Sequence, residues 1–177
     1  QNSPLPASFM DFLINFDGVL PQDWEITGSA SLAPVKAEKD SYYMELNGKA
    51  KKEYVRNSNI MTYSARFIQP EKNDDFKVDF GQSAEIVTSG GALCYRIKDG
   101  GIVPFYENYM ENVWYLLKVY AYYDFGVCDI WLNGKVMAEN VPLLGENNGV
   151  LNFESASAAT GIDDIEVYPR IEEPEDY

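Results

Sequence analysis

The stretch that decides the fold is residues 114–135, which read WYLLKVYAYYDFGVCDIWLNGK. From Leu117 to Tyr122, apolar residues alternate one by one with lysine or tyrosine, and the alternation resumes around Ile130 before it stops at Asn133-Gly134. A period of two is the pattern of a β-strand with one buried face. Asn-Gly adopts the positive φ angles that a tight hairpin turn requires. The stretch therefore predicts antiparallel strands joined by short turns.

The same pattern recurs along the chain. Residues 76–80 and 93–97 alternate apolar and polar side chains, and a second Asn-Gly pair at Asn47-Gly48 predicts another hairpin turn. Turn residues cut the apolar runs at short intervals, with little helical periodicity between them. This organisation predicts an all-β fold, a two-sheet antiparallel β-sandwich of the jelly-roll type.

The 177 residues fit a single β-sandwich domain spanning residues 1–177. Residues 1–10 form a polar lead broken by prolines, which is typical of a mature terminus after a signal peptide has been removed. Residues 170–177 form an acidic tail. We therefore expect a secreted protein that is extracellular, periplasmic or held at the cell surface.

Charge and composition exclude several classes of function. The formal net charge is −14, which repels phosphate backbones and anionic lipids and argues against nucleic-acid partners. No apolar run is long enough for membrane insertion. The chain contains no histidine, so Ser-His-Asp catalysis, Cys-His catalysis and imidazole-bound zinc are excluded. Its two cysteines, Cys94 and Cys128, are expected to be buried free thiols, with one bridge between strands as the alternative.

Three segments in order, residues 16–28, 114–136 and 149–167, carry a family resemblance. They contain an opening Phe-Asp-Gly strand, a Trp-led strand with its Asn-Gly hairpin, and an Asp-Asp-Ile-Glu-Val ending. Together they resemble the concanavalin A-like lectin/glucanase superfamily and its laminin-G-like jelly rolls. The resemblance implies the sandwich fold but does not choose among lectins, glycan-binding modules, hydrolases and adhesive domains.

Glycosidases of that superfamily carry Glu-x-Asp-x-(x)-Glu on one strand, which brings two carboxyl groups together for a retaining mechanism. The nearest match here is Glu38-Lys39-Asp40, and Tyr43 stands where the second glutamate is needed. We therefore assign no catalytic residue. A glycoside hydrolase or lyase relative that uses carboxylates from distant strands stays open as an alternative.

Aromatic side chains on an outer sheet face are the first candidate ligand-binding residues. If Cys128 and Ile130 face the core, then Trp131 faces outward, and by the same alternation so do Tyr120 and Tyr122. Sugars stack their C–H faces on such rings, while polar neighbours bond to the sugar hydroxyls. The alternative is lateral packing of these rings under a loop.

A second candidate group lies in a loop. Tyr106, Asn108 and Tyr109 follow the break at Pro104 and combine aromatic rings with an amide. Loops on a rigid sandwich commonly carry binding residues. The alternative is that the tyrosines cap the open end of the sandwich.

Acidic residues near the two ends suggest a structural Ca²⁺, the only cofactor that we consider. Asp17 lies in the first expected strand, and Asp163 and Asp164 precede the last. Terminal strands of related folds lie side by side, and carboxylates with backbone carbonyls suit calcium. The alternative is that these aspartates accept backbone hydrogen bonds or are solvated.

These observations lead to one functional hypothesis with two alternatives. We expect a secreted, non-catalytic module that binds a polysaccharide or other glycan by aromatic stacking and hydrogen bonds. The alternatives are the hydrolase or lyase relative described above, and an adhesive domain that binds a protein partner.

Overall fold

The computed structural model describes residues 12–14, 24–34 and 42–169, and all of its regular elements are β-strands. The strands are β1 (Phe12–Ile14), β2 (Glu25–Pro34), β3 (Tyr42–Glu53), β4 (Ile60–Ile68), β5 (Phe76–Phe80), β6 (Ala84–Ser89), β7 (Ala92–Arg96), β8 (Ile102–Glu107), β9 (Tyr115–Tyr122), β10 (Val127–Leu132), β11 (Lys135–Pro142) and β12 (Val150–Pro169).

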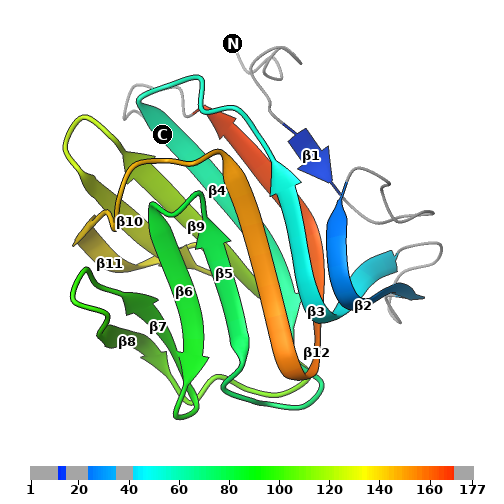
Figure 1. Cartoon of the computed structure of the whole chain (residues 1–177). Coiled ribbons are helices and arrows are strands. Elements are labelled where there is room, and N and C mark those ends of the chain that lie inside the picture. The colour runs from blue at the N-terminus through cyan, green and yellow to red at the C-terminus, as the bar shows by residue number, and fades with distance from the viewer. Residues whose placement is uncertain (1–11, 15–23, 35–41, 170–177) are drawn as a thin grey trace.

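The strands form two layers, as predicted (Figure 1). The front sheet runs β2–β3–β12–β5–β6–β7–β8 and uses the first half of β12. The back sheet runs β12–β4–β9–β10–β11 and uses the second half of β12, which β1 also joins. The pairing register shifts between Ser155 and Thr160, where β12 passes from one sheet to the other. All pairings are antiparallel, so the predicted two-sheet sandwich is confirmed.

The inward faces of the two sheets share one hydrophobic core. On β9, Leu117, Val119 and Ala121 are buried, and their alternating neighbours are only half-buried. Tyr63 and Phe153 add large rings that are fully buried. Each such side chain stabilises the fold by roughly 1.5–3 kcal/mol. The core fixes which residues face outward on every strand, and it therefore determines where a ligand can bind.

Of the two predicted Asn-Gly hairpins, one is confirmed and one is wrong. Asn133 and Gly134 join β10 to β11 with φ angles of 51° and 79°. Asn47-Gly48 instead lies inside β3, with Gly48 directly opposite Gly28 of β2. A Cβ atom on Gly48 would lie 2.1 Å from the carbonyl oxygen of Thr27, so the glycines allow two backbones to approach closely rather than a chain reversal.

The two cysteines are free and buried, as expected. Cys128 belongs to the main core, where burial raises the pKa of its thiol to about 12 and keeps it neutral. Cys94 belongs to a separate small cluster with Val87 and Ala92. The fold therefore places the two thiols in different parts of the sandwich.

Candidate functional site

The outer face of the back sheet carries the aromatic platform, which consists of Trp131, Tyr120 and Tyr122. All three side chains are half-buried on the side of β9 and β10 that faces away from the core, as the alternation predicted. The rings of Tyr120 and Trp131 meet edge to face, with centroids 5.9 Å apart and an interplanar angle of 86°. The contact orients Trp131 without burying it.

A small pocket of about 260 Å³ lies beside the platform. Ser64, Arg66, Lys118 and Glu166 line it together with Leu116 and Asp164. The hydroxyl of Ser64 is buried and has no hydrogen-bond partner among the described residues. A buried polar atom without a partner costs roughly 1–3 kcal/mol, so its retention at a pocket calls for an explanation.

Strand register connects the platform to this pocket. Trp131 lies opposite Lys118, Lys118 lies opposite Ser64, and Ser64 lies opposite Glu166. We call these four residues the back-sheet line. Neighbouring strands are about 4.8 Å apart, so the line extends roughly 14 Å across the strands. One aromatic ring, an ammonium, a hydroxyl and a carboxylate thus follow one another on a single surface.

Asp163 and Asp164, two of the aspartates proposed to bind Ca²⁺, were expected to precede the last strand, but they lie within β12, at a β-bulge next to the same pocket. Asp163 pairs with Arg66 and Glu166 pairs with Ser64, so β12 has one extra residue between these pairs. Asp164 adopts a φ of 49°, which aspartate tolerates better than most residues, and its carboxylate lies 3.1 Å from Nε of Arg66. Asp17 lies outside the described residues. Within the described ranges, no group of three or more acidic or cysteine side chains is arranged to hold a metal.

Tyr106 belongs to strand β8 and not to the predicted loop, whereas Asn108 and Tyr109 follow that strand, and none of the three joins the platform. The rings of Tyr106 and Tyr109 both meet Tyr115 of the core edge to face, at 5.8 and 6.4 Å. Tyr109 is only 1% exposed, and its hydroxyl lies 2.5 Å from Oε1 of Gln69. Burial raises the pKa of this hydroxyl to about 12. We therefore correct the expectation for Tyr109: its ring closes the end of the sandwich and is not accessible to a ligand, while Asn108 stays exposed.

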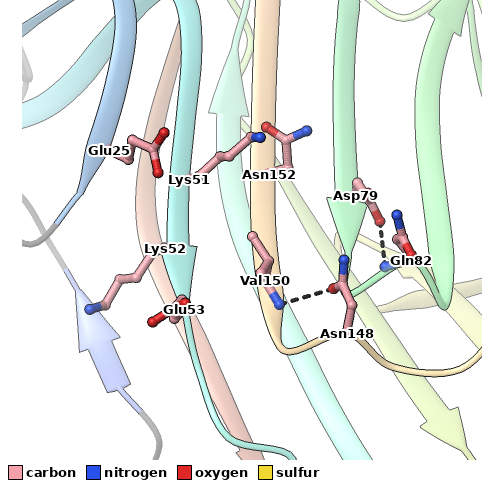
Figure 2. Close-up of a pocket in the computed structure, with 9 residues that line it drawn as sticks. All are labelled: Glu25, Lys51, Lys52, Glu53, Asp79, Gln82, Asn148, Val150 and Asn152. Carbon is pink, nitrogen blue, oxygen red and sulfur yellow. Dashed lines mark hydrogen bonds between the residues drawn. The ribbon is translucent and has the colours of Figure 1, made fainter.

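The front sheet has the larger depression on its outer face, shown in Figure 2. We call this depression, of about 700 Å³, the hollow. Its lining consists of polar and charged side chains with a single apolar one: Glu25, Lys51, Lys52, Glu53, Asp79, Gln82, Asn148, Asn152 and Val150. No aromatic ring is part of this described lining. The hollow can therefore offer hydrogen bonds but no stacking surface.

Four of these side chains lie in register across neighbouring strands. Glu25 of β2 is opposite Lys51 of β3, Lys51 is opposite Asn152 of β12, and Asn152 is opposite Asp79 of β5. Figure 2 shows these side chains in succession across the sheet. Oδ1 of Asn152 is buried and accepts no hydrogen bond from the described part of the chain.

Asp79 has an unusual environment within the hollow. Burial raises the pKa of its carboxyl above the ordinary 3.8, although the backbone N–H of Gln82 donates to it at 2.7 Å and favours the charged form. The neighbouring loop is held by the N–H of Val150, which donates to Oδ1 of Asn148 at 3.0 Å (Figure 2). The hollow therefore has a carboxyl group that takes up a proton more readily than a surface aspartate.

No local sequence pattern predicted the hollow. The alternation in residues 76–80 and 150–153 does indicate that Asp79 and Asn152 face outward. What no local pattern reveals is that β12 lies between β3 and β5. Only the topology brings these distant segments together.

No protein-family model matches the chain, and no characterised protein matches it by sequence. Solved structures share its fold. A sialidase superposes with a TM-score of 0.68 at 11% identity over 92% of this chain, which spans 19% of the sialidase. Domain 4 of AbnA, a GH43 extracellular arabinanase from Geobacillus stearothermophilus solved with arabinotriose, gives 0.61 at 15% identity, covering 90% of this chain and 92% of that domain.

The carbohydrate-binding module CBM66 from Bacillus subtilis gives a TM-score of 0.55 at 10% identity, covering 82% of this chain and 95% of that module. At these identities the likeness concerns the fold alone. The antiparallel β-sandwich is also the fold class that the concanavalin A-like resemblance implies. Within the described residues, no helix is long and apolar enough to cross a membrane.

Proposed function

We propose that this chain is a secreted, non-catalytic glycan-binding module that holds carbohydrate along the back-sheet line. The observation that carries the proposal is the unpartnered, buried hydroxyl of Ser64, two strands from the outward ring of Trp131. A sugar has an apolar C–H face for the ring and hydroxyl groups for the polar side chains. It thus matches both parts of this surface.

The polar groups beside the ring suit a chain of hydroxyl groups. Lys118 donates, Glu166 accepts, and Ser64 does both. Arg66 is already engaged with Asp164, so its charge is partly compensated. Because the line extends roughly 14 Å across the strands, it is longer than one sugar ring. We therefore expect an internal stretch of a polysaccharide, lying across the strands, to bind better than a monosaccharide.

The fold comparisons support this assignment. One structural neighbour is described as a carbohydrate-binding module, and another was solved with arabinotriose bound. Both are covered over more than nine tenths of their length by this chain. A sandwich of this size is thus a known scaffold for sugar binding.

A thermal-shift screen tests the proposal. The purified protein is heated with arabinan, xylan, β-glucan, galactan, alginate and polygalacturonate, each with Ca²⁺ and with EDTA. A ligand at 100 times its Kd adds about 2.7 kcal/mol, which raises the Tm by roughly 5–10 °C for a domain of this size. The Trp131→Ala variant should show a markedly smaller shift, whereas Phe125→Ala should keep the full shift. Phe125 is a matched control because its ring is 79% exposed at the turn between β9 and β10.

The EDTA arm tests the proposed structural Ca²⁺ at Asp17, Asp163 and Asp164. A bound ion stabilises the folded state, so its removal should lower the Tm. Equal Tm values with Ca²⁺ and with EDTA would contradict the ion site and leave the glycan proposal intact.

The alternative function is a glycoside hydrolase or lyase. The observation in its favour is the hollow, where Glu25, Glu53 and Asp79 bring three carboxyl groups to one depression. Assaying the same wells for new reducing ends separates the two functions. Sugar release that disappears in Asp79→Asn would establish catalysis, and a Tm shift without release would establish binding. No shift with any polysaccharide would favour the adhesive, protein-binding alternative.

A further inference from the structure

We infer that the hollow on the front sheet is a second glycan site, selective for neutral polyhydroxyl chains, and that the module cross-links two glycan chains. This inference rests on the proposed function for the back-sheet site. The hollow itself is argued from a separate set of residues.

The two sites lie on opposite outer faces of the sandwich. Strand β12 contributes to both, with Asn152 in its first half and Glu166 in its second. The residues that flank these two, among them Phe153 and Ile165, are fully buried in the common core. Because side chains alternate along a strand, Asn152 and Glu166 each point away from that core, on different sheets. A single bound sugar chain of a few rings therefore cannot occupy both sites.

The hollow offers alternating hydrogen-bond groups across four strands. In register, a carboxylate of Glu25 is followed by the ammonium of Lys51, the amide of Asn152 and the carboxyl of Asp79. Within the described residues, no hydrogen bond or ion pair joins those four side chains to one another, and Oδ1 of Asn152 is buried without a partner there. A hydroxyl group of a ligand can donate to that oxygen, and neighbouring hydroxyls can accept from Lys51.

The charges in the hollow select against acidic glycans. Three carboxyl groups line it, from Glu25, Glu53 and Asp79, against the two ammonium groups of Lys51 and Lys52. A uronate or sulfate group placed there would meet a net negative surface on a protein whose formal charge is already −14. Neutral hydroxyl groups meet no such repulsion. The ligand class is therefore a neutral polysaccharide, bound by hydrogen bonds alone.

Two sites on opposite faces of a rigid scaffold bridge different chains. Once one site holds a segment of a polymer, binding at the second site gains from the high local concentration of equivalent segments. The module would thus bind a soluble polymer more tightly than a short oligosaccharide, and would gather chains into a network.

Calorimetric titration of the full chain tests the inference. Neutral hexasaccharides of arabinan, β-glucan, xylan and galactan are titrated into the wild type, and light scattering is recorded with the parent polymers. The hollow variant is Lys51→Ala/Asn152→Ala, with Lys98→Ala as a control for an exposed lysine outside both sites. The back-sheet variant is Trp131→Ala, with Phe125→Ala as its control.

The inference predicts two hexasaccharides per wild-type chain and one per chain for each site variant. Removing two hydrogen-bonding groups should weaken the hollow roughly tenfold or more. Polymer scattering should appear with the wild type and both controls, and disappear with either site variant although each still binds one oligosaccharide.

If the wild type binds one hexasaccharide per chain, and this binding is lost in Trp131→Ala but unchanged in the hollow variant, the inference is overturned and the proposed function stands. A stoichiometry of one that is lost only in the hollow variant would overturn both the cross-linking and the back-sheet site. Absence of binding by the wild type to all four oligosaccharides and their polymers would overturn the proposed function as well. A hexauronate from polygalacturonate is titrated in the same way into Trp131→Ala, where only the hollow remains, and an affinity equal to that for the neutral oligosaccharides would contradict the selectivity of the hollow.

Discussion

Ser64 of β4 and Lys118 of β9 lie directly opposite each other on the outer face of the back sheet, and the Ser64 hydroxyl is buried beside a pocket without a hydrogen-bond partner in the described structure. Folding alone gives no reason to keep a hydroxyl there, because alanine would fill nearly the same space without the cost of an unsatisfied group. A ligand that supplies the missing hydrogen bond gives such a reason.

Ser64→Ala should therefore stabilise the protein while weakening its binding of glycan. We expect the free energy of unfolding to rise by about 1 kcal/mol, measured in urea, because the unsatisfied hydroxyl is removed. Glycan affinity should fall, measured by titration. The control is Ser155→Ala: this serine is also buried, but its hydroxyl donates to the carbonyl of Ala158 at 2.6 Å, so its loss should destabilise the fold. A destabilised Ser64→Ala variant would contradict the account.

The loop that precedes β12 is held by a network of tyrosine hydroxyls around one amide. Nδ2 of Asn147 lies 2.7 Å from the hydroxyls of Tyr54 and Tyr63 and 2.8 Å from that of Tyr123. Asn147→Ala should lower the free energy of unfolding by about 2–3 kcal/mol, because it leaves buried hydroxyls short of a donor. The exposed Asn57 provides the comparison, since Asn57→Ala should change stability by less than about 0.5 kcal/mol. Equal effects of the two substitutions would show that the network does not stabilise the loop.

Gly48→Ala should be among the most destabilising single substitutions in the chain. The new Cβ would lie 2.1 Å from the carbonyl oxygen of Thr27, so β2 and β3 would have to separate where they pair. We expect a loss above about 3 kcal/mol, or failure to fold. Gly90→Ala is the matched control, because Gly90 also has a positive φ, 58°, but nothing lies within 4 Å of an added Cβ. That variant should lose only about 1 kcal/mol. Thermal unfolding of both variants measures the difference.

Asp79 gives the stability of the protein a defined pH dependence. Burial raises the pKa of its carboxyl in the folded state above 3.8, so the folded state binds this proton more tightly than the unfolded state does. The stability contributed by protonated Asp79 is therefore fully present below the unfolded-state pKa of about 3.8, and it is lost as the pH rises through the raised folded-state pKa. Asp79→Asn cannot ionise, and its amide oxygen can still accept from Gln82. The Tm of the variant minus the Tm of the wild type should accordingly be higher at pH 7 than at pH 3. A difference that does not change with pH, measured by calorimetry, would contradict the raised pKa.

Local sequence patterns predicted correctly which side chains of a strand face outward, but they did not predict which strands lie next to one another. Trp131 was placed on an outer face correctly because alternation along β10 depends only on adjacent residues and a common core. Asn47-Gly48 was misinterpreted because the same dipeptide suits a hairpin turn and a close approach of two strands, and only the partner Gly28 distinguishes the two.

The hollow could not be predicted, because Lys51, Asn152 and Asp79 become neighbours only when β12 inserts between β3 and β5. The inaccessibility of the Tyr109 ring could not be predicted for a related reason. The composition around Tyr109 is that of a binding loop, but Gln69, which accepts a hydrogen bond from its hydroxyl, lies 40 residues away in the sequence.

Affinity electrophoresis in native gels that contain a soluble neutral polysaccharide tests whether the back-sheet line binds glycan. With a net charge of −14, the protein migrates readily towards the anode, so retardation by arabinan, xylan, β-glucan or galactan reports binding. We predict that the wild type and Phe125→Ala are retarded equally by at least one of these glycans and that Trp131→Ala is retarded markedly less. Migration of Trp131→Ala identical to that of the wild type in every gel would contradict glycan binding at the back-sheet line.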